Sequence, residues 1–559
     1  LANGNGTLSL TKTGAGTISL TGTNTFNGGV NLNEGVLSVS TLAAGNTACA
    51  LGGSLGVPAN LVFNGGTLRY TGPTVNGINR AFTLNAPGGT IDIADPATTV
   101  QWTDASGAGP IIGVGTLTKA GVGKLQMSGA NSYSGGTVIS QGALLVSNAS
   151  ALGGGTVTLN DANTGAADTA LLATAPMGIA NAITVANQGS GTSTIGTTNY
   201  TSGANMQFNG TLTLGKGVTL QAGSSDRTTF YGVIGGTGDV TITSPFANNR
   251  RIVFDRSSGA ANSFVGDIYL SNNADLQLGV ANPIGNRTIP DASAVYFASG
   301  SRLRFAPSGA DSETIGALNS QASGAGTVDV YTGNSTFNLT IGSGDADGNF
   351  SGVIQDSSGT LNLIKTGAGT QVLSGTCGYV GATTVRQGTL VVDGSIASSS
   401  GVTVEDGATL GGSGYVPAVN VLLGGHVAPG SSFGTLHSGN TTFAAESFFD
   451  VEISPADWDL LDVQGLVALN GATLRLDPEA SFSHFGGGQY TIIDTRGQVG
   501  GIFDGLPEGA TLEIGGSQFA ITYAGGADGF DVVLTAVPEP ASALLVLLGA
   551  GGLGGYIRR

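Results

Sequence analysis

The feature that most constrains the fold is a repeated unit that occurs three times along the chain. The copies span residues 10–40, 117–147 and 363–393, and they align without gaps. They share a lysine, three glycines, an aromatic residue, a fourth glycine and a closing stretch with an apolar side chain at every second position. The shared positions are Lys12, Lys119 and Lys365; Gly14/Gly16/Gly22, Gly121/Gly123/Gly129 and Gly367/Gly369/Gly375; Phe26, Tyr133 and Tyr379; and Gly35, Gly142 and Gly388. Short alternating strands separated by glycine-rich turns cannot bury their own apolar side, so successive units must stack.

The spacing of the copies selects among all-β architectures. A weaker copy at residues 261–279 keeps Phe264 and Gly266 but lacks the lysine segment. The strong copies begin at Leu10, Leu117 and Leu363, so their intervals are unequal, whereas a propeller needs blades of nearly constant length. No proline-rich or charged linker interrupts residues 1–425, which argues against a string of sandwich domains. We therefore predict a single-chain β-solenoid with loops of variable length, and coils of about 20–25 residues stacked ~4.8 Å apart.

Composition supports a folded, almost all-β chain and restricts its partners. Hydrophobic residues make up 40% and charged residues only 10% of the sequence, which is too apolar for a disordered chain. The 97 glycines need a structural use, and repeated tight turns supply one. The formal net charge of −17 argues against nucleic acid as a partner, because phosphates would be repelled.

The two cysteines are expected to be unpaired. Cys49 and Cys377 match no metal-binding spacing, so no zinc site is proposed. In a solenoid they would lie many coils apart, too far for the approach of about 7 Å between Cα atoms that a disulfide requires. Cys377 stands where the other copies carry Asn24 and Asn131, and we interpret it as a turn substitution.

The pattern K-x-G-x-G, then L-x-G-x-N-x-[FY]-x-G-G, then G-x-L-x-V resembles the autotransporter-associated β-strand repeat of secreted bacterial passenger regions. The resemblance implies a right-handed parallel β-helix exposed outside the cell. Residues 426–536 are similar to the stretch that closes many such passengers, which implies a few more coils and a β cap on the open end. The expected domains are therefore a β-helix over residues 1–425 and a capping region over 426–536.

The end of the chain, residues 537–559, forms a third region with three parts in a fixed order. The motif Val-Pro-Glu-Pro at 537–540 precedes an apolar run at 541–557, and Arg558 and Arg559 end the chain. This order resembles a PEP-CTERM sorting signal. The resemblance implies that an exosortase recognises Pro538, Glu539 and Pro540. A run of this length is at the low end for a transmembrane helix, and we expect the arginines to hold its end in the cytoplasm.

Signals for catalysis and metal binding are weak. Asp345, Asp347 and Asn349 alternate as in some calcium loops, but the glycine and the bidentate glutamate of an EF-hand are missing, so a polar turn is favoured. The segment GSSFG at 430–434 matches the G-x-S-x-G pattern of a nucleophilic serine, Ser432, yet no helix is expected to follow it. We predict no catalytic residue and no cofactor, with calcium the one cofactor left open.

The resulting hypothesis is a non-enzymatic, exported, adhesin-like structural protein of the cell surface or extracellular matrix. Its expected partners are exosortase-type machinery, a membrane through the C-terminal segment, and extracellular polysaccharide or other cell surfaces. The alternative is a carbohydrate-active enzyme, a polysaccharide lyase or hydrolase, on the same scaffold. A calcium-binding module is a third possibility.

Overall fold

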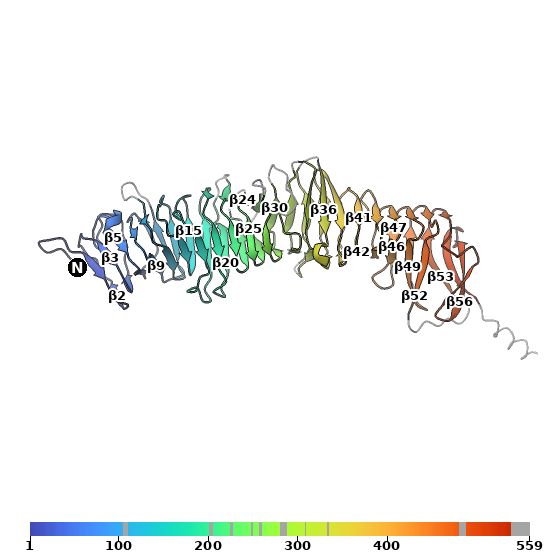
Figure 1. Ribbon diagram of the computed structural model, residues 1–559, viewed down its shortest axis with the longest axis horizontal. Coiled ribbons are helices and arrows are strands. Elements are labelled where there is room, and N and C mark those ends of the chain that lie inside the picture. Colours follow the sequence, from blue (N-terminus) through green and yellow to red (C-terminus); the bar gives the residue numbers. More distant parts are fainter. Residues whose placement is uncertain are drawn as a thin grey trace, which may run out of the picture. The chain divides into compact units, whose positions relative to one another are not determined.

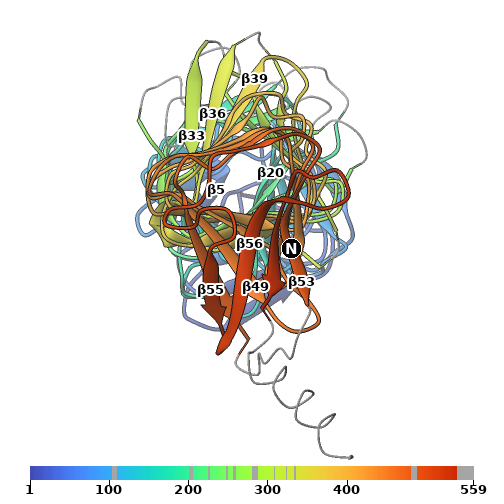
Figure 2. The same cartoon turned by 90° about the vertical axis from the view of Figure 1, so that its right-hand side faces the viewer.

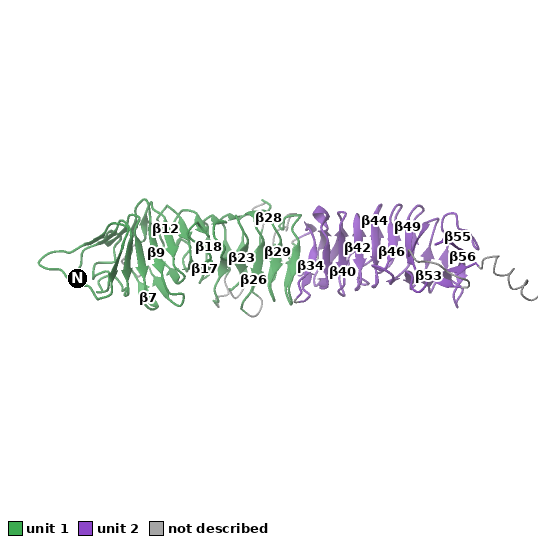
Figure 3. Cartoon of the chain, turned by 90° about the horizontal axis from the view of Figure 1, so that it is seen from below, with its two compact units in different colours: residues 1–308 green, residues 309–559 purple. Residues whose placement is uncertain are grey.

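The computed structural model is built almost entirely of short β-strands (Figure 1). It describes residues 1–103, 110–200, 205–223, 227–246, 250–255, 260–279, 288–307, 309–322, 324–332, 335–479 and 488–537. Helical structure in these residues is confined to two 3₁₀ turns, η1 (Pro58–Asn60) and η2 (Ser343–Asp345). The chain divides into two compact units, residues 1–308 and 309–559, which Figure 3 shows in different colours.

Unit 1 is a stack of parallel strands in which each coil of the chain adds one strand to each of several sheets. Its longest sheet has the order β2 (Thr17–Leu20), β4 (Val36–Val39), β6 (Thr67–Tyr70), β9 (Gly89–Ile93), β12 (Leu117–Ala120), β14 (Thr137–Ile139), β16 (Val157–Leu159), β19 (Ile183–Val185), β22 (Leu212–Leu214), β25 (Ile234–Thr237) and β28 (Ser263–Val265). A second sheet in this unit runs from β7 (Val75–Ile78) to β31 (Val295–Phe297) and includes β13 (Lys124–Met127) and β15 (Gly142–Val146). A third sheet begins with β1 (Leu10–Lys12), β3 (Val30–Leu32) and β5 (Leu61–Phe63).

Unit 2 repeats this architecture. One sheet has the order β33 (Asp311–Thr314), β36 (Thr336–Ile341), β39 (Thr360–Lys365), β41 (Thr383–Val385), β43 (Val402–Val404), β45 (Val419–Val421), β48 (Thr441–Phe443), β51 (Val467–Ala468) and β54 (Val499–Gly500). A second has the order β37 (Gly348–Phe350), β40 (Thr370–Leu373), β42 (Gly388–Val392), β44 (Ala408–Gly412), β46 (His426–Pro429), β49 (Phe448–Ile453) and β52 (Thr473–Pro478). This second sheet carries the larger groove described below.

Inward-facing side chains form apolar ladders along each unit. In the longest sheet of unit 1, Leu37 pairs with Leu68 and Leu68 with Ile91, and all three are buried. Such ladders replace water contacts of each side chain by contacts with the coils before and after it, contributing about 1.5–3 kcal/mol for each fully buried aliphatic side chain. The parallel β-solenoid predicted from the repeat is thus confirmed.

Coil length varies as the sequence predicts. Leu117 pairs with Thr137 of the following coil, whereas Ile183 pairs with Leu212, so the coil that begins at Ile183 is the longer of the two. The register of the strands on either side is kept, so the extra residues of the longer coil form loops outside the ladders.

The pairing changes from parallel to antiparallel at the C-terminal end of unit 2. β47 (Thr435–Ser438), β50 (Leu460–Val463) and β53 (Gln489–Thr495) are still parallel neighbours. Three antiparallel pairings follow, joining β53 to β57 (Asp531–Ala536), β57 to β56 (Ser517–Gly525), and β56 to β55 (Thr511–Ile514). Figure 2 shows β53, β55 and β56 together at this end of the unit.

Some expectations about the fold stay predictions. The sheets continue across the boundary expected at 425/426, because β44 pairs with β46 and β46 with β49. Within the described residues, no helix is long and apolar enough to cross a membrane. The transmembrane helix predicted at 541–557 lies outside the described residues. The right-handed winding of the solenoid and the division at 425/426 remain predictions.

Candidate functional site

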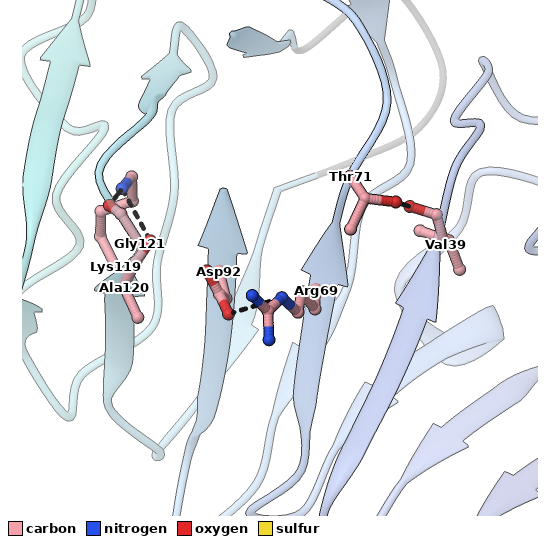
Figure 4. Close-up of polar contacts among 7 residues, drawn as sticks. All are labelled: Val39, Arg69, Thr71, Asp92, Lys119, Ala120 and Gly121. Atoms are coloured by element: carbon pink, nitrogen blue, oxygen red, sulfur yellow. Dashed lines mark hydrogen bonds and ion pairs between the residues drawn. The ribbon is translucent and has the colours of Figure 1, made fainter. Parts of the chain in front are cut away.

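The shared spacing within the repeat builds a lysine clasp, by which we mean a buried lysine whose ammonium group donates to three backbone carbonyls. Lys119 Nζ donates to the carbonyl oxygens of Ala120 and Gly121 at 2.8 and 2.6 Å (Figure 4), and to that of Gln141 at 3.1 Å. Lys12 and Lys365 make the same three bonds in the other copies, at 2.5–3.1 Å. An ammonium has three N–H donors, so each clasp gives every one of them an acceptor.

The clasp explains why a lysine can stand in an apolar ladder. Lys119 pairs with Ile91 on one side and with Ile139 on the other, and its side chain is fully buried. The aliphatic stem continues the ladder while the ammonium reaches the turn at the end of β12. Burial lowers the pKa of Lys119 to about 7, and the carboxylate of Asp92 opposes this shift.

The aromatic residue of the repeat is paired with a matched partner four positions later. Tyr133 Oη lies 2.6 Å from Thr137 Oγ1, and Tyr379 Oη lies 2.7 Å from Thr383 Oγ1. In the first copy the tyrosine is replaced by Phe26, and the residue four positions on is Val30. Both members of the pair change together because a buried hydroxyl without a partner is costly. This pairing was not recognised in the sequence, although both positions fall inside the aligned copies.

A small groove lies on the outer face of unit 1 beside the second copy. It has a volume of about 460 Å³ and is lined by side chains of β6, β9 and β12 and by the turn that follows β14. Arg69 and Asp92 form an ion pair there, with 3.5 Å between Nε and Oδ2 (Figure 4). The Arg69 side chain is half exposed, so this pair contributes little to stability.

A larger groove, here called the axial groove, lies on the outer face of unit 2 over six successive strands. It has a volume of about 730 Å³ and is lined by side chains of β40, β42, β44, β46, β49 and β52. Thr370, Thr389 and Thr409 occupy equivalent positions on the first three strands and form a row of half-buried hydroxyl groups. A neighbouring row contains Val372 and Val391.

The row of threonines continues into a charged and aromatic cluster. His426 pairs in register with Thr409, and its ring stacks on Phe448 with 4.5 Å between the ring centroids. Its Nδ1 lies 2.6 Å from Asp450 Oδ2. The guanidinium of Arg475 covers the same Phe448 ring, 3.5 Å from its centroid, in a cation–π contact. This end of the groove therefore offers fixed donors and acceptors for hydrogen bonds.

Asp459 closes one wall of the axial groove and has a strongly perturbed carboxyl group. Burial raises its pKa to about 7, while hydrogen bonds from the backbone N–H groups of Glu452 and Gly434 oppose the shift. These bonds are 2.8 and 3.0 Å long. Through Asp459 they link the loop between β46 and β47, which contains Gly434, to β49, which contains Glu452. A carboxyl group that titrates near neutral pH in a groove is typical of binding and catalytic sites.

A second histidine–aspartate pair with a stacked aromatic ring lies in unit 2 on a different sheet, away from the lining of the axial groove. His437 Nδ1 lies 2.7 Å from Asp462 Oδ2, and Tyr415 stacks on the His437 ring with 4.5 Å between the centroids. Neither His437 nor Asp462 is among the described residues that line the groove. The two clusters therefore provide a natural comparison between similar chemistry inside and outside a concave surface.

The calcium candidates fill structural roles in the described residues. Asp345 Oδ1 accepts from the backbone N–H of Ala368, and Asp347 Oδ1 accepts from that of Thr370, both at 2.7 Å. The Asn349 N–H donates to Asn319 Oδ1. The described part of the chain contains no cluster of three or more His, Cys, Asp or Glu that could hold a metal ion. These polar groups therefore bind neighbouring coils, and calcium binding stays a prediction.

Other predicted residues are placed as follows. Ser432 is exposed on the turn between β46 and β47, and because both of these described elements are strands, this segment is not the strand-to-helix elbow of a nucleophilic serine. Cys49 and Cys377 form no disulfide with each other, in agreement with the prediction, and both thiols are buried. Burial raises the pKa of the Cys377 thiol to about 11, so it stays protonated at neutral pH. Pro538, Glu539, Pro540, Arg558 and Arg559 lie outside the described residues.

Two cationic side chains that bind backbone carbonyls were missed in the sequence. Lys216 is half-buried, lies outside the three copies, and its Nζ donates to the carbonyls of Gly189 and Gly191 at 2.8 and 2.7 Å. Arg80 is almost fully buried and donates to five backbone carbonyls within residues 43–54, which organises the loop that contains Cys49. The sequence did indicate both side chains, because Arg80 and Lys216 are each an isolated charged residue in an otherwise uncharged segment.

Comparison with known proteins assigns the repeat. The family model described as Passenger-associated-transport-repeat matches residues 10–39, 117–146 and 363–392. The three copies are passenger-associated-transport repeats. Residues 536–559 match the PEP-CTERM protein-sorting motif. The resemblances inferred for the repeat and for the C-terminal segment are thus both confirmed.

The chain is also homologous to an autotransporter. The Adhesin BmaC autotransporter of Brucella suis biovar 1 (strain 1330) is 30% identical over 356 residues. The match covers 60% of this chain and 9% of that relative. The chain thus corresponds to a small part of the relative's length.

Proposed function

We propose that the protein is an exported, non-enzymatic, adhesin-like β-solenoid of the cell surface or extracellular matrix. The observation that carries this proposal is the combination, in one chain, of passenger-associated-transport repeats with a C-terminal sorting motif. The relative named an adhesin supports the same role for the repeats. In this account the solenoid presents its loops and outer faces to an external ligand, such as extracellular polysaccharide or another cell surface.

In this proposal the C-terminal segment directs the export of the protein. Residues 541–557 insert in the inner membrane as a temporary anchor, with Arg558 and Arg559 on the cytoplasmic side. An exosortase-type enzyme then recognises Pro538, Glu539 and Pro540 and releases the solenoid. The protein is the substrate of this reaction and supplies no catalytic group to it.

The test is fractionation of cells that make the full chain, a chain ending at Ala536, or a chain with alanine at positions 538, 539 and 540. We expect the full chain to become accessible to added protease at the cell surface, and both variants to be retained or mislocalised. Adhesion of the cells to immobilised polysaccharide should follow surface exposure. Equal surface exposure of all three chains would contradict the sorting role.

A carbohydrate-active enzyme is the second candidate. The axial groove supports it, because its lining contains both the His426–Asp450 pair and Asp459, whose pKa burial raises to about 7. Release of reducing ends or of unsaturated products from a polysaccharide by the purified chain, lost in Asp459→Asn, would establish the enzyme and overturn the adhesin.

A further inference from the structure

We propose that the axial groove binds a linear, hydroxyl-rich polysaccharide without negative charge, lying along the solenoid axis. This inference rests on the proposed function and identifies the surface that performs it. Neither the repeat nor the sorting motif points to this face of unit 2.

Register gives the first argument. The threonine row repeats once per coil, and parallel strands in a sheet lie ~4.8 Å apart. The six strands that line the groove therefore extend over roughly 24 Å along the axis. A linear polymer aligned with the axis would meet an equivalent hydroxyl at each of the threonine-bearing coils, whereas a compact ligand would use only one or two.

Side-chain chemistry gives the second argument. Each threonine hydroxyl can donate one hydrogen bond and accept others, which suits a polyhydroxylated ligand. The adjacent Val372 and Val391 provide apolar surface for the C–H faces of such a ligand. At the far end of the groove, the Asp450 carboxylate and the Arg475 guanidinium add charged acceptors and donors, held in place by His426 and Phe448.

Charge gives the third argument. The described lining residues include four carboxyl groups, against one guanidinium and one histidine. The carboxyl groups are those of Asp450, Glu452, Asp459 and Asp477, and the basic side chains are Arg475 and His426. Polymers rich in carboxylate, sulfate or phosphate would be repelled by this excess of acidic groups. A polysaccharide with free amino groups should bind at least as tightly as its neutral counterpart, since the acidic wall attracts it.

The experiment measures binding of the full chain to three soluble hexasaccharides by isothermal titration calorimetry at pH 6, where the amines of a glucosamine oligomer carry a proton and uronic acids remain ionised. The probes are a neutral β-1,4-linked glucose oligomer, a β-1,4-linked glucosamine oligomer with free amines, and an oligomer of uronic acids. We expect the glucosamine oligomer to bind at least as tightly as the glucose oligomer, and the uronate at least tenfold more weakly than either. Tightest binding of the uronate, or no binding of any probe, would overturn the proposal.

Matched variants locate the site. Thr389→Arg fills the groove, whereas Thr403→Arg adds the same side chain at an outer position of β43 on another sheet. His426→Ala removes the ring in the groove, and His437→Ala removes the corresponding ring in the cluster outside it. The groove variants should weaken binding at least tenfold and the controls less than twofold, with all four melting as cooperatively as the parent. Equal losses in both sets would overturn the proposal.

The outcome is independent of sorting. Purified chain that reaches the surface in cells but binds no oligosaccharide refutes the groove assignment and leaves the exported-adhesin proposal standing. Chain that binds through the groove but never leaves the cell refutes the exported-adhesin proposal alone. Binding of a basic peptide such as polylysine through the groove, without oligosaccharide binding, would also overturn the inference.

Discussion

The paired hydroxyls inside the second repeat allow a quantitative test of how the repeat is stabilised. Thr137 Oγ1 donates to the carbonyl of Leu152 at 3.2 Å, so the Tyr133 hydroxyl must be the donor in its 2.6 Å bond to Thr137. Both side chains are fully buried. Replacing Thr137 by valine therefore leaves the tyrosine O–H without this acceptor and the Leu152 carbonyl without this donor.

The expected magnitudes follow from this direction of donation. An unsatisfied buried hydroxyl costs about 1–3 kcal/mol, so Thr137→Val should lower the free energy of unfolding by about 2 kcal/mol. Tyr133→Phe only removes a donor from Thr137, which keeps its own acceptor, and should cost about 1 kcal/mol. The double variant reproduces the Phe26–Val30 pair of the first copy and should cost about 1 kcal/mol, which gives a coupling energy of about 2 kcal/mol.

Urea denaturation of the parent chain, the two single variants and the double variant measures these differences. Hydrogen exchange in β14 and β16 locates them in the second copy and the coil that follows it. The first copy supplies the reverse control, since Phe26→Tyr and Val30→Thr should each destabilise alone and compensate together. Additive losses in the second copy, with no recovery in the double variant, would refute the reasoning.

Three further predictions concern buried charges. Lys119→Met should speed hydrogen exchange in the turn after β12 by roughly 10–100-fold, since three carbonyls lose a charged donor, whereas the exposed control Lys124→Met should change it less than twofold. Arg80→Met should selectively increase proteolytic cleavage within residues 43–54, because this loop loses its shared donor; an unchanged cleavage pattern would contradict that role. The pKa of Asp459 is raised from 3.8 to about 7 on folding, so the folded state binds the proton more tightly. The stability that protonated Asp459 contributes is complete below about pH 4 and is lost as the pH rises through 7. The free energy of unfolding of Asp459→Asn should therefore fall less between pH 4 and pH 7 than that of the parent chain, which thermal melting at each pH measures.

The solenoid could be predicted from the sequence because its cause is local and repeated. Alternating apolar residues and glycine turns occur in every copy, and Gly14, Gly121 and Gly367 all adopt a φ near +70°, which favours glycine. The lysine was recognised as a shared position, but its role was not. Its partners are backbone carbonyls, whose positions depend on the turn geometry and on the next coil.

The axial groove could not be predicted for a related reason. Its lining comes from six strands between Thr370 and Asp477, and only the register of the coils brings these residues to one face. His426 and His437 look equivalent in the sequence, because each has an aspartate partner about one coil later. The structure separates them, since one lines a concave surface and the other lies on a different sheet.

The C-terminus of the mature protein tests the central claim most directly. Chain recovered from the cell surface or the medium would be digested, and its C-terminal peptide identified by mass spectrometry. The account predicts a terminus at or next to Pro538-Glu539-Pro540, with residues 541–559 absent from the exported form and present in the membrane-bound precursor. Recovery of exported chain that still ends at Arg559 would contradict it.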